Sequence, residues 1–458
     1  MKLTKDLTEG NIYKNFILYT VPLILSALLS SLYSTVDAMI AGKLIGENAL
    51  GAITATASYD FLFYAFFTGF GTGFAVYIAM LFGKKDHACL KRDTVHVLCI
   101  LAVVVLCISG VSILLCDRIL DLLRVDPILR ADAKIYFVIY AAGYVFTYLN
   151  LLLLQVLQSL GITRVSLYVS LGSATVNLIG NLLTVLVLKM GVAGLALSTV
   201  FSTLMATGIY LWMIRRAFRD LPTPGTSYRF SFSCLRRSLR YTLPAAIQQT
   251  AYHCVGFLIA PTINGLGAAA TTANTVANRI KNMVSLSFWN GTAALSCYTA
   301  QCVGAGKQER IRKGLWADFC FCVGLLLPFL FVFVTFARPI TSLFFPTGYV
   351  GEAYQYALRF STFYLLFIGI NMLGHLIHAY LRGLGEMNVV FGLSVLGSLV
   401  NFIAVLSLVP QMGMEGVYLG LLLGWIADTV GSVLLYVLFF RTRAHIDRAL
   451  RRTQGGGL

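Results

Sequence analysis

The sequence predicts an all-α integral membrane protein, in which twelve transmembrane helices form two homologous six-helix lobes. Of its 458 residues, 58% are hydrophobic and only 12% are charged, and the mean hydropathy is +0.79. That composition leaves too little polar surface to cover a soluble globule of this size. Apolar spans of membrane-crossing length recur along the chain, and landmarks of the first half recur in the second.

Twelve segments reach the length of about 20 residues that a bilayer-crossing helix needs. They are 15–43, 50–82, 94–116, 132–156, 164–188, 192–214, 240–264, 268–303, 315–336, 354–381, 388–409 and 415–440. The longest polar connection, 215–240, contains Pro222-Thr-Pro-Gly225 and predicts a linker. The expected lobes are therefore residues 1–220 and residues 221–458, the second ending in a basic cytoplasmic tail.

The first span contains a motif that recurs once. Tyr19-Thr-Val-Pro22 is repeated as Tyr241-Thr-Leu-Pro244, at the start of the seventh predicted span. Other landmarks recur in the same order and at nearly the same separation: Gly83 with Gly304, Gly161 with Gly385, Asn177 with Asn401, and Gly194 with Gly416. A repeat that takes up almost half of the chain indicates a duplicated lobe, as found in transporters, rather than a solenoid of short helical repeats.

The basic residues predict the orientation. About 25 lie in the loops and termini of one side and about 6 on the other, which places both termini in the cytoplasm by the positive-inside rule. The tail Arg441–Arg452 would then face anionic lipid, although a protein partner is an alternative. The net charge of +16 does not indicate nucleic-acid binding, because the basic residues are divided among short segments between apolar spans.

Polar residues inside the spans are the candidates for function, because hydrocarbon tolerates them only when they pair or line a cavity. Asp37 is the one acid of the first span, and Pro22 gives the same helix a bend point. Asn177 and Asn181 lie one helical turn apart, so their amides share a face. With Asp37 and the Thr199 hydroxyl they would form an oxygen site for Na⁺, or a cage around a protonatable carboxyl. The alternative is that these asparagines only join helices, at about 0.6 kcal/mol per hydrogen bond.

Other intramembrane residues are candidate members of a substrate cavity: Asp60, Asn371, His375, His378 and Asp428. The alternative for Asp60 is an acid paired near the outer surface, and for the histidines it is a packed, hydrogen-bonded ring. Arg279 and Lys281 are expected to pair locally or to extend toward the interface. The ten cysteines include no Cys-x-x-Cys pair, so neither a disulfide framework nor a metal centre is expected.

Several of these features together resemble the multidrug and toxic compound extrusion (MATE) family over nearly the whole chain. They are the duplicated six-helix plan, Pro22 fifteen residues before Asp37, Gly83-Lys84 and Gly304-Ala-Gly-Lys307, the two Leu-x-x-Leu-Gly turns, and Gly191-Val-Ala-Gly194. The resemblance implies two lobes in a V and efflux of organic cations or related drugs in exchange for protons or sodium. It also implies a cation-coupling site formed by Asp37, Asn177, Asn181 and Thr199, with Tyr33 one turn before Asp37 and Pro22 as the hinge.

One departure from the family pattern concerns the second lobe. A branch of the family has coupling carboxylates there, at positions where this chain has Tyr252 and Asn371. This argues against coupling through the second lobe, and the sequence resembles the DinF-like bacterial branch more closely.

The sequence therefore predicts a secondary antiporter of a bacterial plasma membrane that exports lipophilic cations by alternating access. The alternative is a flippase of lipids or lipid-linked oligosaccharides from the same superfamily, whose cavity would need basic residues to hold pyrophosphate; Arg279 and Lys281 are the candidates. The sequence shows neither a cluster of metal ligands nor a nucleophile paired with a base, so it does not indicate an enzyme. We expect a monomer among membrane lipids, with H⁺ or Na⁺ as coupling ion, no cofactor and no nucleic-acid partner.

Overall fold

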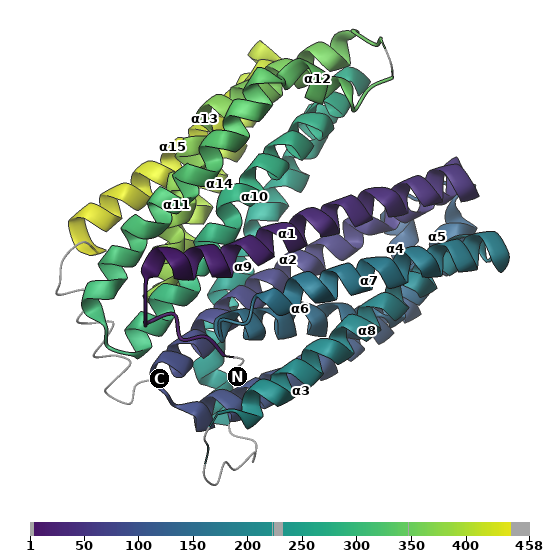
Figure 1. Cartoon of the computed structure of the whole chain (residues 1–458). Coiled ribbons are helices and arrows are strands. Elements are labelled where there is room, and N and C mark those ends of the chain that lie inside the picture. Colours follow the sequence, from purple (N-terminus) through teal and green to yellow (C-terminus); the bar gives the residue numbers. More distant parts are fainter. Residues whose placement is uncertain (1–3, 222, 224–231, 347, 441–458) are drawn as a thin grey trace. The chain divides into compact units, whose positions relative to one another are not determined.

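The computed structural model describes residues 4–221, 223, 232–346 and 348–440 (Figure 1). All regular structure in these residues is helical. The chain divides into two compact units: unit 1 comprises Met1–Asp6 and Val21–Thr242, and unit 2 comprises Leu7–Thr20 and Leu243–Leu458. The basic tail Arg441–Arg452 and part of the expected linker lie outside the described residues.

The first half of the chain contains six of the predicted spans and one additional short helix. One predicted span consists of two helices, α5 and α6, and two helices end in a turn of π-helix. The elements are α1 (Ile12–Ile40, continued by the π turn Ala41–Ile45), α2 (Glu47–Gly83), α3 (His87–Leu114), α4 (Cys116–Leu122), α5 (Arg130–Ala142), α6 (Tyr144–Ser159), α7 (Arg164–Leu182, continued by the π turn Leu183–Val187) and α8 (Gly191–Arg219).

The second half repeats this order, again with one short helix. Its elements are α9 (Phe232–Asn264), α10 (Ala268–Gly304), α11 (Gln308–Thr335), α12 (Ala337–Ser342), α13 (Glu352–Gly383), α14 (Met387–Met412) and α15 (Met414–Leu435, continued by the π turn Tyr436–Phe440).

The helices match the twelve predicted spans. Nine helices of the described chain are long and apolar enough to cross a membrane, and the bent pair α5–α6 makes a tenth. The other two predicted spans are α9 and α10, which are 33 and 37 residues long. The fold class predicted from the sequence is therefore confirmed.

Three helices begin seven or eight residues earlier than predicted. α3 starts at His87 rather than residue 94, α11 at Gln308 rather than 315, and α9 at Phe232 rather than 240. Charged residues such as Lys91 and Arg310 lie in these added turns. Hydropathy marks only the apolar part of a helix that continues into the membrane interface, so the sequence pattern missed them.

The span predicted over 132–156 is bent by 48° between α5 and α6, and the sequence did not predict this bend. The break lies at Gly143, where an added Cβ would come within 2.5 Å of the Val200 side chain on α8. A glycine permits both the close approach and the kink.

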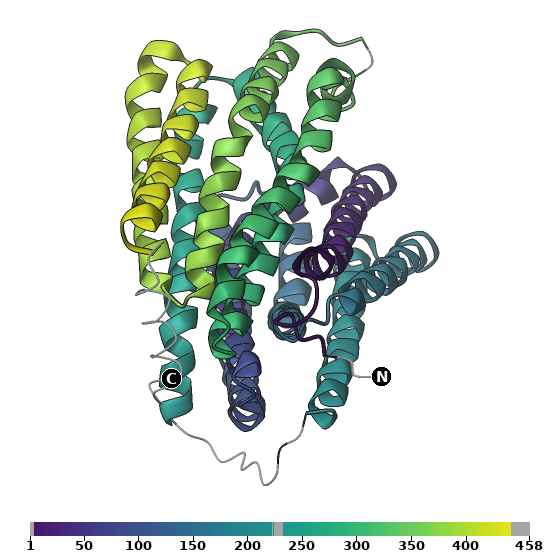
Figure 2. The ribbon, with the colours of Figure 1, turned by 60° about the vertical axis from the view of Figure 1, so that its left-hand side comes forward.

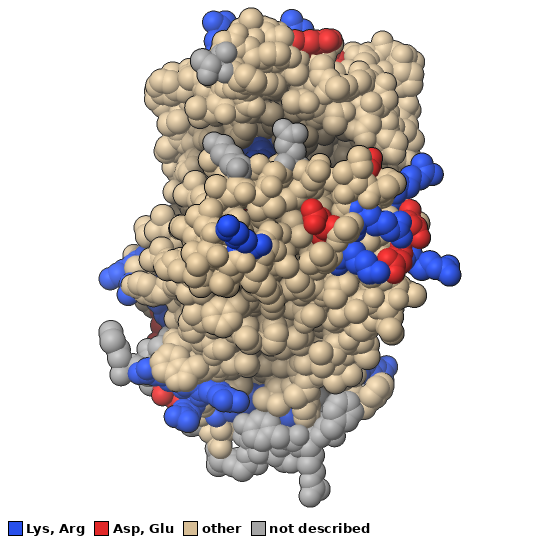
Figure 3. Space-filling model, turned by 90° about the vertical axis from the view of Figure 1, so that its right-hand side faces the viewer, with Lys and Arg blue, Asp and Glu red and all other residues tan. Residues whose placement is uncertain are grey.

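The helices expose many large apolar side chains. Leu114, Leu122 and Leu343 are each more than four-fifths exposed. On the face drawn in Figure 3, the Lys and Arg side chains gather in separate groups, with a wide uncharged surface between them. Water disfavours such a surface, whereas a bilayer requires it.

Glycines permit a close helix contact in unit 2, between α14 and α15. A Cβ added at Gly416, Gly420 or Gly424 of α15 would lie within 2.7 Å of an α14 atom. The yellow-green and yellow helices of Figure 2 show this pair lying side by side. Close approach through small residues is the usual way in which helices pack within membranes.

The repeated Tyr-Thr-x-Pro motif marks the border between the units. α1 passes from unit 2 to unit 1 after Thr20, and α9 passes from unit 1 to unit 2 after Thr242. Two residues beyond each threonine is a proline, Pro22 or Pro244, whose missing N–H removes one backbone hydrogen bond from the helix. Each unit thus contains the first turns of a helix that continues in the other.

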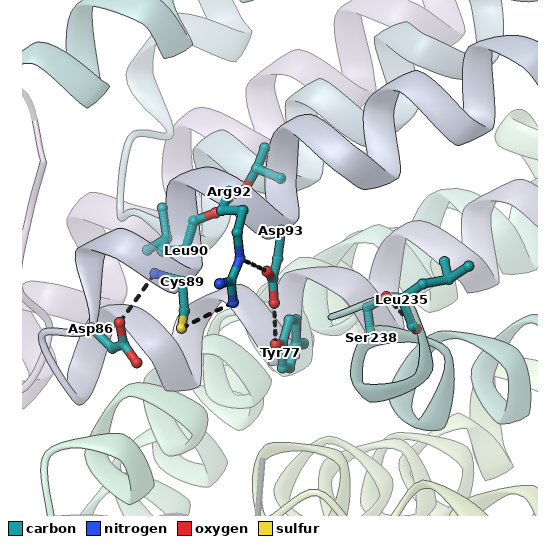
Figure 4. A network of polar contacts seen from close by, with 9 residues as sticks. Tyr77, Asp86, Cys89, Leu90, Arg92, Asp93, Leu235 and Ser238 are labelled. Carbon is teal, nitrogen blue, oxygen red and sulfur yellow. Dashed lines mark hydrogen bonds and ion pairs between the residues drawn. The ribbon is translucent and has the colours of Figure 1, made fainter. Parts of the chain in front are cut away.

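In unit 1 these first turns pack against Tyr77 of α2. The Tyr77 ring centre lies 5.5 Å from that of Tyr241 on α9. Its hydroxyl donates to the fully buried carboxylate of Asp93 at 2.5 Å, and Arg92 Nε lies 3.2 Å from the same carboxylate (Figure 4). A charged network therefore lies beneath the start of α9.

The equivalent tyrosine of the second half, Tyr298 of α10, has a different partner in unit 2. Its ring centre lies 5.3 Å from that of Phe16 on α1. Its hydroxyl donates to the Arg310 carbonyl oxygen at 3.1 Å, and its ring covers Gly314. Here the packing is apolar and the hydrogen bond is neutral.

Candidate functional site

Asp37 lies on α1, fifteen residues after Pro22 and just before the π turn that ends the helix. Its side chain is half-buried. Asn177 and Asn181 lie on α7, which also ends in a π turn, and both are fully buried. π-Helical turns are rare and frequently occur at functional sites. Beside this site the two π turns contribute to one apolar cluster, through Ala41 and Val185.

Hydrogen bonds bring five predicted residues together around Asp37. Asn181 Nδ2 donates to Asp37 Oδ1 at 2.5 Å. The Asn177 amide lies 2.7 Å from the Asn181 amide and 3.2 Å from Thr199 Oγ1. With its nitrogen turned toward Asp37, Asn177 donates to Oδ1 at 3.0 Å and accepts from the Tyr33 hydroxyl at 2.9 Å. The residues predicted from α1, α7 and α8 thus form one connected cluster.

The Asp37 cluster contains no basic side chain. None of the ion pairs in the described part of the chain involves Asp37. A proton would neutralise the carboxylate, and Na⁺ would find oxygen ligands in Asp37, Thr199 and the two amides. Asn181 Oδ1 is buried and accepts no hydrogen bond within the described structure, so it is available to a cation. The cluster therefore fits either ion.

A second acid of unit 1, Asp60 on α2, lies in a cavity of about 220 Å³. The Tyr144 hydroxyl of α6 donates to Asp60 Oδ1. Four further tyrosines line the cavity: Tyr64, Tyr136, Tyr140 and Tyr148. A carboxylate among aromatic faces is the arrangement that recognises organic cations.

One tyrosine links this cavity with the first site. Tyr140 interacts electrostatically with both Asp60 and Asp37, and its ring stacks on that of Tyr136 with the centres 5.6 Å apart. Tyr140 therefore lies close enough to interact with both acids of unit 1.

In unit 2 the structure pairs two of the predicted cavity residues. His378 Nε2 on α13 lies 3.2 Å from Asp428 Oδ1 on α15 and 3.1 Å from Ser432 Oγ. His378 is buried and Asp428 is about one-fifth exposed, at 21%. These residues lie far apart in the sequence, on helices that are not consecutive, so spacing did not predict their pairing.

The other predicted residues of unit 2 lie around this pair. The His375 ring packs on Phe288 and Trp289, with ring centres 6.0 and 6.3 Å away. Asn371, one turn earlier on α13, is half-buried, and within the described residues it forms no hydrogen bond with the pair.

The two basic residues of α10 lie apart from these acids. Arg279 is exposed. Lys281 Nζ lies 5.3 Å from the centre of the Tyr364 ring, a cation–π contact. Lys281 thus has the local partner that the sequence analysis expected for it.

Sequence reasoning missed two buried acids. Asp93 was placed in a loop because the third span was predicted to begin at residue 94, yet it lies in the first turns of α3 and is fully buried. Asp318 lies inside a predicted span and was overlooked. It is fully buried, with Oδ2 3.7 Å from Cys322 Sγ. An acid within the apolar run 315–336 was the available signal.

The tyrosines of the Asp60 cavity were missed for a different reason. Tyr136, Tyr140, Tyr144 and Tyr148 recur every four residues, which was a readable helical stripe. Such a stripe is also what an ordinary apolar core produces, so the pattern alone did not distinguish a cavity wall from a core.

Known proteins resemble this chain along most of its length. Residues 22–183 and 244–406 match the MatE family, each stretch beginning at a proline of the repeated motif. The chain is 26% identical over 358 residues to "Probable multidrug resistance protein YoeA" of Bacillus subtilis (strain 168), with 75% of each protein covered. It is 22% identical over 452 residues to "Multidrug export protein MepA" of Staphylococcus saprophyticus, covering 96% of this chain and 97% of the relative.

The fold also has close neighbours among solved structures. The structure described as "Outward-facing conformation of a multidrug resistance MATE family transporter of the MOP superfamily" superposes with a TM-score of 0.86. The match covers 98% of this chain and 99% of that one, at 18% sequence identity. At 18% identity the likeness concerns the fold alone. The function must be argued from the match to the MatE family and from the sites.

Proposed function

The chain belongs to the MatE family of membrane transporters, and from this premise we propose that it is a secondary antiporter that exports organic cations in exchange for protons or sodium ions. The observation that carries the proposal is the Asp37 cluster, in which a half-buried carboxylate has amide and hydroxyl partners but no basic one. A lone intramembrane acid is costly unless it takes part in function.

The coupling ion would act at Asp37. In exchange transport the ion and the substrate must each bias the same conformational equilibrium, which requires a site whose charge changes. Proton or Na⁺ binding removes the net charge of this cluster, and release restores it. Tyr33, Asn177, Asn181 and Thr199 would then hold the carboxylate in position through both states.

The substrate is proposed to be a lipophilic cation bound at the Asp60 cavity. A desolvated cation gains from a carboxylate and from aromatic faces, whereas an anion would be repelled. The names of the relatives, which refer to multidrug resistance and multidrug export, agree with this chemistry. Asn371, His375, His378 and Asp428 are candidates for the corresponding surface of the second lobe.

Topology is part of the same proposal. Both termini would face the cytoplasm of a bacterium, the protein would be a monomer in the plasma membrane, and the lobes would be residues 1–220 and 221–458. Pro22 would serve as the hinge of α1. Cysteine labelling of residues 215–240 from the cytoplasmic side tests the orientation, because these residues should then be inaccessible from outside.

The function is tested by measuring export of a lipophilic dye cation from proteoliposomes under separately imposed proton and sodium gradients. The proposal expects a gradient to drive uptake or release of the dye, and expects that effect to be lost in Asp37→Asn but retained in Asp220→Asn, an exposed acid at the end of α8. No dye movement under either gradient, together with flipping of a pyrophosphate-linked lipid that depends on Arg279 or Lys281, would establish the flippase instead.

A further inference from the structure

We propose that His378 and Asp428 form a second proton-binding site, located in unit 2, which exchanges a proton during transport. The inference rests on the proposed antiport for its role in the cycle, but not for the existence of the site. It differs from the expectation that the second lobe lacks coupling groups, because that expectation concerned the positions of Tyr252 and Asn371.

The geometry of the pair is that of an acid and a base held together. His378 Nε2 and Asp428 Oδ1 are 3.2 Å apart. Asp428 Oδ1 is buried and has no hydrogen-bond partner of ordinary geometry in the described structure. An imidazole with hydrogen on Nε2 can supply that donor, and a second proton on the ring adds a positive charge beside the carboxylate.

Protonation changes the charge of the pair. When His378 takes up a proton, both ring nitrogens carry hydrogen and the imidazolium and Asp428 carboxylate together have no net charge. When the proton leaves, neutral imidazole remains beside a carboxylate, and one negative charge is left in the membrane. Because burial of an unpaired charge is costly, proton binding and release at this pair bias the conformation of unit 2.

Helix packing fixes the two partners. Gly397 of α14 faces Asp428, where an added Cβ would come within 2.7 Å of the Asp428 Cβ, and Gly374 of α13 lies beside Asp428 and Thr429. Ser432 Oγ, one turn after Asp428, lies 3.1 Å from His378 Nε2 and sets the orientation of the ring. The exposed fraction of Asp428, 21% against 5% for His378, makes the carboxylate the side of the pair by which a proton enters.

The internal repeat of the chain supports a functional role for the pair of His378 and Asp428. Asn401 of α14 occupies the place in the second half that Asn177 occupies in the first. Gly424 of α15 packs against Asn401, one turn before Asp428, and Asn401 Oδ1 is buried without a hydrogen-bond partner in the described structure. The duplicated fold thus places an amide and an acid on facing helices in both units.

Other titratable groups lie on the helices around the pair. On α13 these are His375, whose ring centre lies 6.4 Å from that of His378, and Arg382, which interacts with His375. On α9, Tyr252 interacts with Asp428. On α10, the nearest cation described, Lys281, lies over Tyr364, and α14 presents Asn401 and Gly397, which do not titrate.

The site itself is tested by histidine hydrogen–deuterium exchange, which follows the protonation of each imidazole by mass spectrometry. In the purified wild-type protein we expect the exchange rate of His378 to change with pH as the ring gains and loses a proton. We expect Asp428→Asn to alter that pH dependence, and His87, at the start of α3 in unit 1, to serve as the internal reference. A flat profile, or a His378 profile unchanged by Asp428→Asn, would overturn the site even if the protein transports drugs.

Its role in transport is tested by counting protons exchanged per dye cation from reversal potentials in proteoliposomes. The wild type should exchange one proton more than His378→Gln or Asp428→Asn, while Ser407→Ala, which removes an exposed hydroxyl of α14 bonded to the Ile403 carbonyl oxygen, should match the wild type. Equal proton counts in all four proteins would overturn the role. Loss of all transport in the wild type would instead contradict the proposed function, and the exchange experiment would still decide the existence of the site.

Discussion

The two units place an amide at equivalent positions but bring the acid from different helices. In unit 1, Asn177 of α7 contacts Asp37 of α1. In unit 2, the equivalent amide is Asn401 of α14, and the acid, Asp428, comes from α15. The position equivalent to Asp37 in the repeat is Ile259, which is buried in an apolar cluster of unit 2. Duplication thus set the framework of helices, while the acid was positioned separately in each half.

That difference changes which ion each site can take. The Asp37 cluster offers several oxygens, so both a proton and Na⁺ fit. The pair in unit 2 contains an imidazole, which binds a proton but is a poor ligand for a hard cation such as Na⁺. The two proposals therefore assign to unit 1 a site for either ion and to unit 2 a site selective for protons.

The largest effect should come from removing the acid of unit 1. Asp37→Asn should lower gradient-driven efflux by at least about 100-fold, because an amide neither binds a proton nor balances Na⁺, and a barrier increase of about 2.7 kcal/mol already corresponds to that factor. Asp428→Asn should retain substantial transport. Initial rates in proteoliposomes measure both variants.

One further variant calibrates this result. Asn181→Ala should lower the rate less than Asp37→Asn, by about tenfold, because it removes one donor of several. Folding is checked by size-exclusion chromatography. Wild-type rates in Asp37→Asn, or equal losses in Asp37→Asn and Asp428→Asn, would abolish the proposed difference between the units.

Which features of the fold and the site the sequence predicts depends on how far apart in the chain the interacting residues lie. The spans were predictable because bilayer thickness imposes a length and an apolar composition on each helix. Asn177 and Asn181 were predictable as a pair, because helical periodicity places residues four apart on one face. Their proximity to Asp37 came from the family resemblance, since no local pattern connects α1 with α7.

The features that the sequence could not predict depend on tertiary packing. The pairing of His378 with Asp428 requires α13 and α15 to be adjacent at one depth, and Gly374 of α13, which faces Asp428 and Thr429, permits that approach. The earlier starts of α3 and α11 were hidden because interfacial turns are polar, and so Asp93 was mistaken for a loop residue. These errors have one cause. Hydropathy indicates whether a segment is surrounded by lipid or by water, and it does not indicate which helices pack against that segment.

The next largest effect should concern the Asp60 cavity of unit 1. Asp60→Asn should raise the KM for a quaternary ammonium dye about tenfold, which corresponds to about 1.4 kcal/mol of binding energy, with a smaller change in kcat. Tyr144→Phe is the matched control, because it removes the hydroxyl that bonds to Asp60 and keeps the charge. An unchanged KM in Asp60→Asn would remove the cavity from the substrate path.

The repeated tyrosines give a comparison of stability. Tyr77→Phe breaks a hydrogen bond to the buried carboxylate of Asp93, at a cost of about 1.5–3 kcal/mol, whereas Tyr298→Phe breaks a neutral bond to a carbonyl, at about 0.5–1.5 kcal/mol. The thermal midpoint in detergent should therefore fall further for Tyr77→Phe. Equal shifts would mean that the charged network of Figure 4 adds nothing to the anchoring of α9.

The smallest effect should appear at the short helices α4 and α12, which occupy equivalent places in the two halves. Asp121 of α4 pairs with Arg130 at 2.5 Å, whereas in the second half Tyr354 donates to the Arg338 carbonyl oxygen at 3.4 Å. The hydrogen bond from Arg130 lowers the pKa of Asp121 below its ordinary value. The stabilisation by this pair is therefore complete above the unfolded-state pKa and is lost as the pH falls through the folded-state value.

We expect acidification to loosen α4 but not α12, and only in the range below about pH 4. Amide hydrogen exchange of the two helices, corrected for the intrinsic rate at each pH, measures this. Both partners are exposed, so the change should be small and should shrink further in high salt, which screens such pairs. Arg130→Gln should reduce the acid dependence of α4, where the pair of Asp117 with Lys134 remains, while leaving α12 and transport unchanged. Equal acid sensitivity of both helices would show that the ion pair does not hold α4, and that the two halves are alike at this point.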